Sequence, residues 1–195
     1  MPGLDPFIRH AITPPAFDQA KVHRHRLVDA LHAQITKKLI VVAAPPGYGK
    51  TTLLADFHYH TEIPTCWLRL TEADSDVMRL ASVLQASLAR RFRRLRGRPH
   101  LEGLSTVSPK ALARMFAAAV EDQVSEPFAI LMDDTHLVNA SPPVLEFLDE
   151  LLEAIPGQGT LVAAGREVLD VSLARLMAAG DLAGLGPQDL ALTPE

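Results

Sequence analysis

Short apolar runs alternate with longer amphipathic stretches along the whole chain. The apolar runs lie at residues 39–43, 64–70, 128–132 and 160–164. Runs of this length, bounded by loop residues, are typical of strands that are buried on both faces of a sheet. The pattern therefore predicts several short strands separated by other elements.

Between these runs, apolar residues recur at three- and four-residue steps, as Leu80, Leu84 and Leu88 do. This period indicates helices with one buried face. The predicted helices cover residues 22–36, 50–60, 76–92, 108–124, 141–155 and 169–179, and a last edge strand is expected at 190–192. Strands that alternate with helices predict an α/β fold, in which helices cover both sides of a parallel sheet of about five strands.

The first 20 residues contain four prolines and little periodicity. We expect residues 1–21 to form an extended lead-in and residues 22–195 to form one core domain. A chain of 195 residues is long enough for a single well-buried core.

Composition narrows the function classes without naming one. The net charge of −4 gives no general attraction to nucleic acid or to an anionic membrane, and 5% aromatic residues argue against a base-stacking platform. No signal pattern or membrane-length apolar run is found, and the single cysteine, Cys66, suits a reducing compartment. We therefore expect a cytoplasmic protein.

The run at 39–43 leads into the segment Ala44-Pro-Pro-Gly-Tyr-Gly-Lys-Thr-Thr52, which is followed by a helical pattern. A strand, a glycine loop, Gly-Lys-Thr and a helix make up the phosphate-binding loop of nucleoside triphosphatases. Glycines allow backbone N–H groups to surround a phosphate, and the helix directs its positive end to the same point. Lys50 is expected to reach the β- and γ-phosphates and Thr51 to bind Mg²⁺.

The predicted phosphate loop departs from the usual pattern at its first position, where Ala44 replaces glycine. A methyl group is tolerated there if the backbone keeps a negative φ. A dinucleotide-binding loop fits less well, because Thr52 stands where its third glycine would be and Lys50 has no role in it. The expected nucleotide ligands are Pro46, Gly47, Tyr48, Gly49, Lys50, Thr51 and Thr52.

Two carboxylates follow the apolar run at 128–132 directly, where strand ends gather in a parallel sheet. We expect Asp133 to hold Mg²⁺ and Asp134 to orient or deprotonate the attacking water. Arg166 follows the run at 160–164 and is expected at the same edge, near the γ-phosphate. The alternatives are a simple turn at Asp133-Asp134 and a solvated arginine at 166.

Taken together, these segments resemble the nucleotide-binding domain of the LuxR/MalT-type transcription regulators, which belong to the signal-transduction ATPases with numerous domains. The resemblance rests on co-linear motifs along residues 12–195. They are Pro-Pro-Gly-Tyr-Gly-Lys-Thr-Thr-Leu-Leu at 45–54, Trp-Leu-Arg-Leu-Thr at 67–71, Met-Asp-Asp-Thr-His-Leu at 132–137 and Ala-Gly-Arg at 164–166.

The resemblance implies a three-layer α/β/α P-loop NTPase sandwich with strand order 5-1-4-3-2. It also implies ATP rather than GTP and, by position alone, contact between Arg24 and the base. Family members continue with a winged-helix and helical lid, sensor repeats and a helix-turn-helix, none of which is found in these 195 residues. We therefore expect no direct DNA binding by this chain, and self-association or other protein domains as its partners.

The predicted function is a switch domain of a LuxR/MalT-like regulator that binds ATP and Mg²⁺ and hydrolyses ATP slowly. Lys50, Asp134 and Arg166 are the candidate catalytic residues; Thr51 and Asp133 are the candidate metal ligands. One alternative is a small kinase that uses the basic run at 90–98 over a metabolite. Another is a truncated interaction module that binds nucleotide weakly.

Other patterns favour ordinary structural roles. The arginines at 90–98 lie at a predicted helix end, where positive charge is favourable. His58 and His60 are two residues apart on a helix and so face different ways, which argues against a metal site. Cys66 lies beside Trp67 in a strand and is expected to pack in the core.

Overall fold

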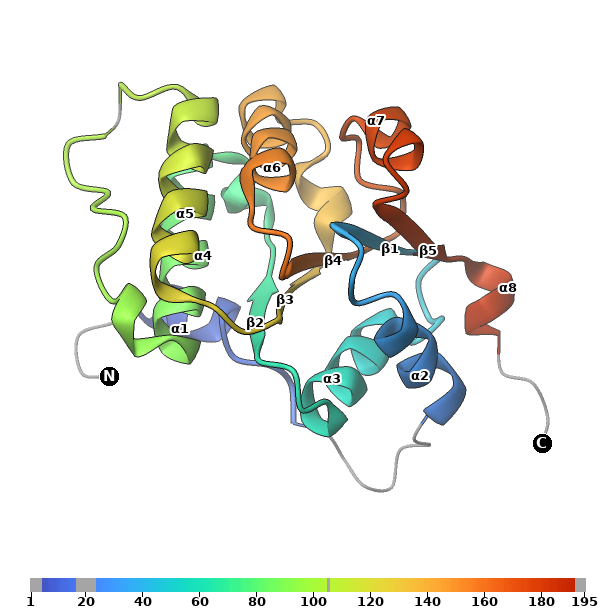
Figure 1. Cartoon of the computed structure of the whole chain (residues 1–195). Coiled ribbons are helices and arrows are strands. Elements are labelled where there is room, and N and C mark those ends of the chain that lie inside the picture. Colours follow the sequence, from blue (N-terminus) through green and yellow to red (C-terminus); the bar gives the residue numbers. More distant parts are fainter. Residues whose placement is uncertain (1–4, 17–23, 105, 192–195) are drawn as a thin grey trace.

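The computed structural model describes residues 5–16, 24–104 and 106–191, and its centre is a five-stranded parallel sheet (Figure 1). The strands are β1 Leu39–Ala43, β2 Thr65–Arg69, β3 Phe128–Asp133, β4 Gly159–Gly165 and β5 Leu182–Leu185. Their order is β2-β3-β4-β1-β5, and every paired strand is parallel. The predicted order 5-1-4-3-2 is confirmed, since it is the same order taken from the other edge.

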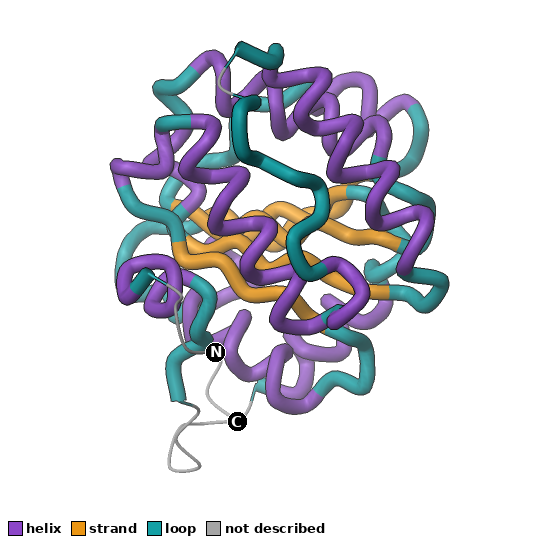
Figure 2. The backbone as a smooth tube through the Cα atoms, turned by 90° about the vertical axis from the view of Figure 1, so that its left-hand side faces the viewer, coloured by secondary structure: helices purple, strands orange, loops and turns teal. Residues whose placement is uncertain are grey.

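The helices cover both faces of this sheet, as the tube in Figure 2 also shows. They are α1 Pro6–Ala11, α2 His25–Ala33, α3 Lys50–His60, α4 Val77–Arg91, α5 Pro109–Gln123, α6 Pro142–Ala154, α7 Leu173–Ala178 and α8 Pro187–Leu190. Short 3₁₀ turns lie at η1 Glu72–Ser75, η2 Arg93–Leu95 and η3 Thr135–Val138. The predicted α/β/α architecture is confirmed.

Side chains of alternate strand residues enter two separate cores. Leu39 and Val41 of β1 join the larger core, which also contains the apolar faces of α4, α5 and α6. Ile40 and Val42 join the smaller core, beneath α2 and α3. Because both faces are covered, β3 and β4 are buried along their whole length, which explains their uninterrupted apolar sequence.

Local signals in the sequence set several helix starts. Ser108 caps α5 by accepting a hydrogen bond from the backbone N–H of Ala111, and Pro109 occupies the first helical position. Asp76 caps α4 in the same way through the N–H of Arg79. No helix in the described ranges is long and apolar enough to span a membrane.

Two predictions at the ends of the chain are wrong in part. Residues 6–11 form α1 instead of extended chain, with Asp5 as its cap and Pro6 in its first turn. The last strand is β5, beside β1, whereas Leu190 ends α8. Leu192, which completes the predicted strand, and the proposed boundary at residues 21–22 lie outside the described residues.

Candidate functional site

The loop between β1 and α3 has the backbone that a phosphate-binding loop needs. Gly47 and Gly49 have φ values of 89° and 75°, in the region that glycine adopts without strain. No heavy atom lies within 4 Å of the position of a Cβ at Gly47, so the requirement there is conformational. Gly49 is the N-cap of α3, and the N-terminus of this helix faces the loop.

The side chain of Lys50 folds back onto this loop. Its Nζ donates hydrogen bonds to the carbonyl oxygens of Ala44 and Pro45, at 2.6 and 3.0 Å. Burial lowers the pKa of Lys50, whereas the charges of Asp133 and Asp134 oppose that shift. The lysine and both carboxylates therefore lie within electrostatic reach of one another.

The replacement of glycine by Ala44 does not distort the loop. Among the described residues, Asp134 is the only residue other than glycine with a positive φ, so Ala44 keeps the negative φ that its methyl group requires. Ala44 is buried in the smaller core, and its N–H donates to the carbonyl of Gly165 at 3.3 Å. The alanine thus joins the loop to β4.

Thr51 and Asp133 are in direct contact. The Thr51 hydroxyl donates a hydrogen bond of 2.8 Å to Oδ2 of Asp133. Asp133 is 1% exposed, and burial raises its pKa even though the bond from Thr51 acts against the change. Its carboxylate forms no ion pair with any residue that the structure describes, and a bound metal ion would stabilise a buried charge of this kind.

Asp134 follows in a left-handed conformation, with φ 62° and ψ 35°. Its Oδ2 lies 3.6 Å from Nε of Arg69, which ends the neighbouring strand β2. Arg69 was not among the residues predicted for this site. No local pattern could have identified it, because only the register of β2 against β3 sets Arg69 beside Asp133.

Arg166 is exposed just beyond β4, and its charge lowers the pKa of Lys50. The preceding Gly165 is tightly enclosed: a Cβ there would lie 2.8 Å from Oγ1 of Thr135. His136, in the same turn, has a buried Nδ1 without a partner among the described residues. The ends of β3 and β4 are therefore packed closely beside the loop.

Arg24, at the N-cap of α2, reaches the same loop. Its Nη1 donates to the carbonyl of Tyr48 at 3.2 Å, and its Nη2 donates to the carbonyl of Leu190. Its backbone N–H donates to the buried carboxylate of Asp56 at 2.9 Å. Burial lowers the pKa of Arg24, and both hydrogen-bonded guanidinium nitrogens face backbone carbonyls.

The remaining predicted ligands lie where the loop meets solvent. Pro46 and Tyr48 are exposed, and Thr52 is half-buried in the first turn of α3. Within the described ranges, no group of three or more histidine, cysteine or acidic side chains could hold a metal ion. A magnesium site that uses Thr51, Asp133 and phosphate oxygens needs no such group, so the residues present fit Mg²⁺ with a nucleotide.

Comparison with known proteins gives a consistent result. A family model described as an AAA domain matches residues 33–170. The HTH-type transcriptional regulator MalT of Klebsiella pneumoniae is 28% identical over 177 residues, which cover 88% of this chain and 19% of MalT. MalT of Cronobacter sakazakii is 29% identical over 179 residues, with the same shares. The chain thus spans about a fifth of the length of these relatives.

Solved structures agree on the fold. A Walker-type ATPase of Pyrococcus abyssi superposes with a TM-score of 0.56 at 15% identity, over 88% of this chain and 56% of that one. A chain in a structure of Drosophila ORC bound to AT-rich DNA and Cdc6 gives a TM-score of 0.51 at 9% identity, over 84% of this chain and 56% of that one. The predicted resemblance to the nucleotide-binding domain of MalT-type regulators is confirmed.

Proposed function

Since the chain belongs to the AAA domain family, we propose that it binds Mg-ATP and hydrolyses it slowly, as the switch domain of a MalT-like transcription regulator. One observation carries the proposal. The Thr51–Asp133 hydrogen bond holds the first turn of α3 against the end of β3, beside a glycine loop with open backbone geometry. The groups that we propose to bind the phosphates and the metal ion therefore lie at one edge of the sheet.

Each residue then has a stated role. Lys50 turns from the carbonyls of Ala44 and Pro45 to the β- and γ-phosphates, and Thr51 and Asp133 hold the metal ion. When bound, Mg²⁺ supplies positive charge that offsets the charge of the phosphate oxygens. Asp134 orients or deprotonates the water that attacks the γ-phosphate.

The two arginines predicted from the sequence act at opposite ends of the nucleotide. Arg166 contacts the γ-phosphate and distinguishes ATP from ADP. Arg24 lies beside the loop through its bond to Tyr48, where it supports the base and ribose side. Ordering of the turns after β3 and β4 by the γ-phosphate then provides the switch, which hydrolysis reverses.

Slow turnover follows from the environment of the candidate base. Asp134 is paired with Arg69 at 3.6 Å, so its carboxylate has to leave this partner before it can orient the attacking water. Such a domain acts in the cytoplasm by contact with other protein domains or with a second copy of itself. The MalT relatives are named as HTH-type transcriptional regulators, and this chain supplies the nucleotide-dependent step of such a protein.

The alternative function as a small kinase receives no support from the position of the basic run at 90–98. Arg90 and Arg91 end α4 and line a cavity with Thr65, at the start of β2. The phosphate loop and Asp134 lie at the other end of the strands. Arginines that close over a transferred phosphate would have to lie at that end.

Titration of Mg-ATP and Mg-ADP against the purified chain tests the proposal. We expect saturable binding that Lys50→Ala weakens at least tenfold, because one charged contact to phosphate is lost (about 1.4 kcal/mol or more). Lys110→Ala is the matched control, since Lys110 is exposed near the start of α5. Circular dichroism checks that both variants are folded.

Two results would contradict the proposal. The first is no binding of either nucleotide by the folded wild-type chain. The second is equal binding by wild type and Lys50→Ala, which would place the nucleotide away from the loop. Release of inorganic phosphate, measured with wild type and Asp134→Asn, tests hydrolysis separately from binding.

A further inference from the structure

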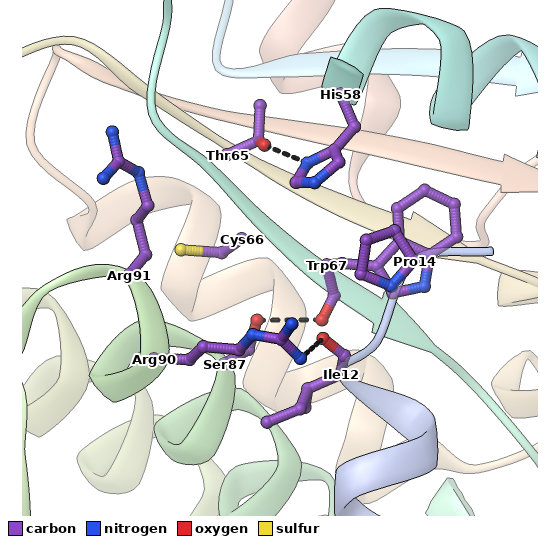
Figure 3. A pocket seen from close by; sticks show the side chains of 9 residues that line it. All are labelled: Ile12, Pro14, His58, Thr65, Cys66, Trp67, Ser87, Arg90 and Arg91. Carbon is purple, nitrogen blue, oxygen red and sulfur yellow. Dashed lines mark hydrogen bonds between the residues drawn. The ribbon is translucent and has the colours of Figure 1, made fainter. Parts of the chain in front are cut away.

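A cavity of about 150 Å³ lies at the outer edge of the sheet beside β2 (Figure 3). Residues on both faces of this edge strand contribute to it. Thr65 and Trp67 line it together with His58 from the end of α3, while Cys66 lines it with the last turns of α4. Ile12 and Pro14, which follow α1, close it from outside the sheet.

This cavity is separate from the proposed nucleotide site. β2 runs parallel to β3, so its first residue, Thr65, and its last, Arg69, lie at opposite ends of the sheet. The phosphate loop, Asp133 and Arg69 gather at the carboxyl ends of the strands, and the cavity surrounds residues 65–67 at the beginning of β2. Its residues have no part in the function proposed above.

The cavity is positively charged. Arg90 and Arg91 line it from α4, and no aspartate or glutamate is among its lining residues. Neither arginine forms an ion pair with any residue that the structure describes. The adjacent Cys66 thiol brings no compensating charge, because burial raises its pKa to about 12.

The two arginines are held differently. Arg90 is fixed by hydrogen bonds from its Nη1 to the carbonyl of Ile12 and the hydroxyl of Thr13, at 3.1 and 2.9 Å. Arg91 extends beside Cys66 (Figure 3), and its guanidinium lies 5.9 Å from the ring centroid of Phe92. Arg90 is therefore a preorganised charge, and Arg91 is able to turn toward a ligand.

Part of the lining is apolar, with one unmet polar group. Ile12, Pro14 and the ring of Trp67 form this part of the lining. Trp67 is 2% exposed, and its indole N–H has no acceptor among the described residues. A buried donor without an acceptor is unfavourable, and the indole N–H becomes available to an acceptor only if the residues around it move.

We propose that this cavity binds a small organic acid, with its carboxylate at Arg90 and Arg91 and its apolar body against Trp67, Ile12 and Pro14. Guanidinium groups recognise carboxylates through paired hydrogen bonds. A cavity of about 150 Å³ accepts a body of roughly the size of a benzene ring. The lining residues come from the segment after α1 and from α3, β2 and α4. A bound acid would therefore contact all four.

Intrinsic tryptophan fluorescence reports on this site, because Trp67 is the only tryptophan of the chain. Benzoate is the probe, benzamide is its uncharged counterpart, and inorganic phosphate is an anion without an apolar body. We expect benzoate to change the Trp67 fluorescence saturably, with a Kd of about 1 mM, as suits a ligand of so few atoms. Benzamide and phosphate are expected to bind at least tenfold more weakly.

Variants near the end of α4 distinguish a specific site in the cavity from a general attraction of anions to a basic surface. Arg91→Ala is expected to weaken benzoate binding about tenfold, the loss of one charged contact, and Arg91→Lys to recover part of it. Arg94→Ala removes the same charge from the same basic stretch, outside the cavity, and is expected to leave the Kd unchanged.

Three outcomes would overturn the proposal. One is the absence of a fluorescence change with benzoate when the chain is folded. Another is an equal loss of affinity in Arg91→Ala and Arg94→Ala, which would mean surface attraction alone. The third is an equal response to benzoate and phosphate, which would mean that the cavity recognises charge without an apolar body.

Discussion

The hydroxyl of Thr51 donates a hydrogen bond of 2.8 Å to Oδ2 of Asp133, a residue 82 positions further along the chain. This bond joins the start of α3 to the end of β3, and it satisfies one oxygen of a carboxylate that is 1% exposed. The same two side chains are the proposed ligands of Mg²⁺. Stability and the proposed metal binding therefore depend on the same pair.

Removal of the hydroxyl should separate the two roles of this pair. We expect Thr51→Ala to lower the free energy of unfolding by about 1–3 kcal/mol, because a buried carboxylate oxygen loses its donor. Mg²⁺-dependent ATP binding should weaken more than binding measured with EDTA. Urea unfolding and nucleotide titration measure the two effects, and Thr51→Ser, which keeps the hydroxyl, should restore both. Wild-type behaviour of Thr51→Ala in both assays would contradict the prediction.

The buried carboxyl of Asp133 should make stability depend on pH. Burial raises its pKa above the ordinary value of 3.8, so the folded chain keeps this proton to higher pH than the unfolded chain does. The stability that it contributes is complete below the unfolded-state pKa and is lost as pH rises through the folded-state pKa. Without Mg²⁺ or nucleotide, Asp133→Asn should therefore be more stable than wild type at neutral pH, by about 0.5–2 kcal/mol.

Urea unfolding across a series of pH values measures this difference, which should vanish in acid. Mg²⁺-dependent nucleotide binding by Asp133→Asn should be lost at every pH, since an amide is a weaker metal ligand than a carboxylate. A variant less stable than wild type at neutral pH would show that the hydrogen bond from Thr51 outweighs the cost of burying the charge.

The pair of Arg69 and Asp134 should limit hydrolysis. Arg69→Ala removes the guanidinium 3.6 Å from the carboxylate of the candidate base, so Asp134 is free to turn toward the attacking water. We expect ATP turnover to rise about three- to tenfold, with Arg69→Lys close to wild type. Phosphate release at saturating Mg-ATP is the measurement, and Arg96→Ala, in an exposed position, is the control. A fall in turnover would instead indicate that Arg69 stabilises the transition state directly.

The alanine in the phosphate loop should matter for stability and not for binding. Ala44 is buried and has a negative φ, so Ala44→Gly loses a packed methyl group and adds freedom to the unfolded chain. We expect a loss of about 1 kcal/mol of stability and an unchanged Kd for Mg-ATP. Thermal unfolding and titration test the two parts. Tighter nucleotide binding by Ala44→Gly would show that the methyl group obstructs the loop.

The main elements of the site were predictable because each has a local physical cause. Gly47 and Gly49 supply backbone angles that other residues rarely adopt, and a run such as residues 128–132 is stable only when it is covered on both faces. Arg69 was missed because its partner lies on another strand. The last strand was misplaced because residues 182–185 include Gly184 and are only half-buried, so they carry a weak strand pattern.

By itself, the sequence determined the α/β class, the parallel strands, the loop that ends in Lys50 and Thr51, and the acidic pair that follows β3. These features follow from apolar periodicity and backbone preference, which act between near neighbours. Only the tertiary structure decided the pairing of Arg69 with Asp134, the contact of Arg24 with the loop and the cavity beside β2. These arise where distant segments meet, and the register of one strand against another cannot be read from either strand alone.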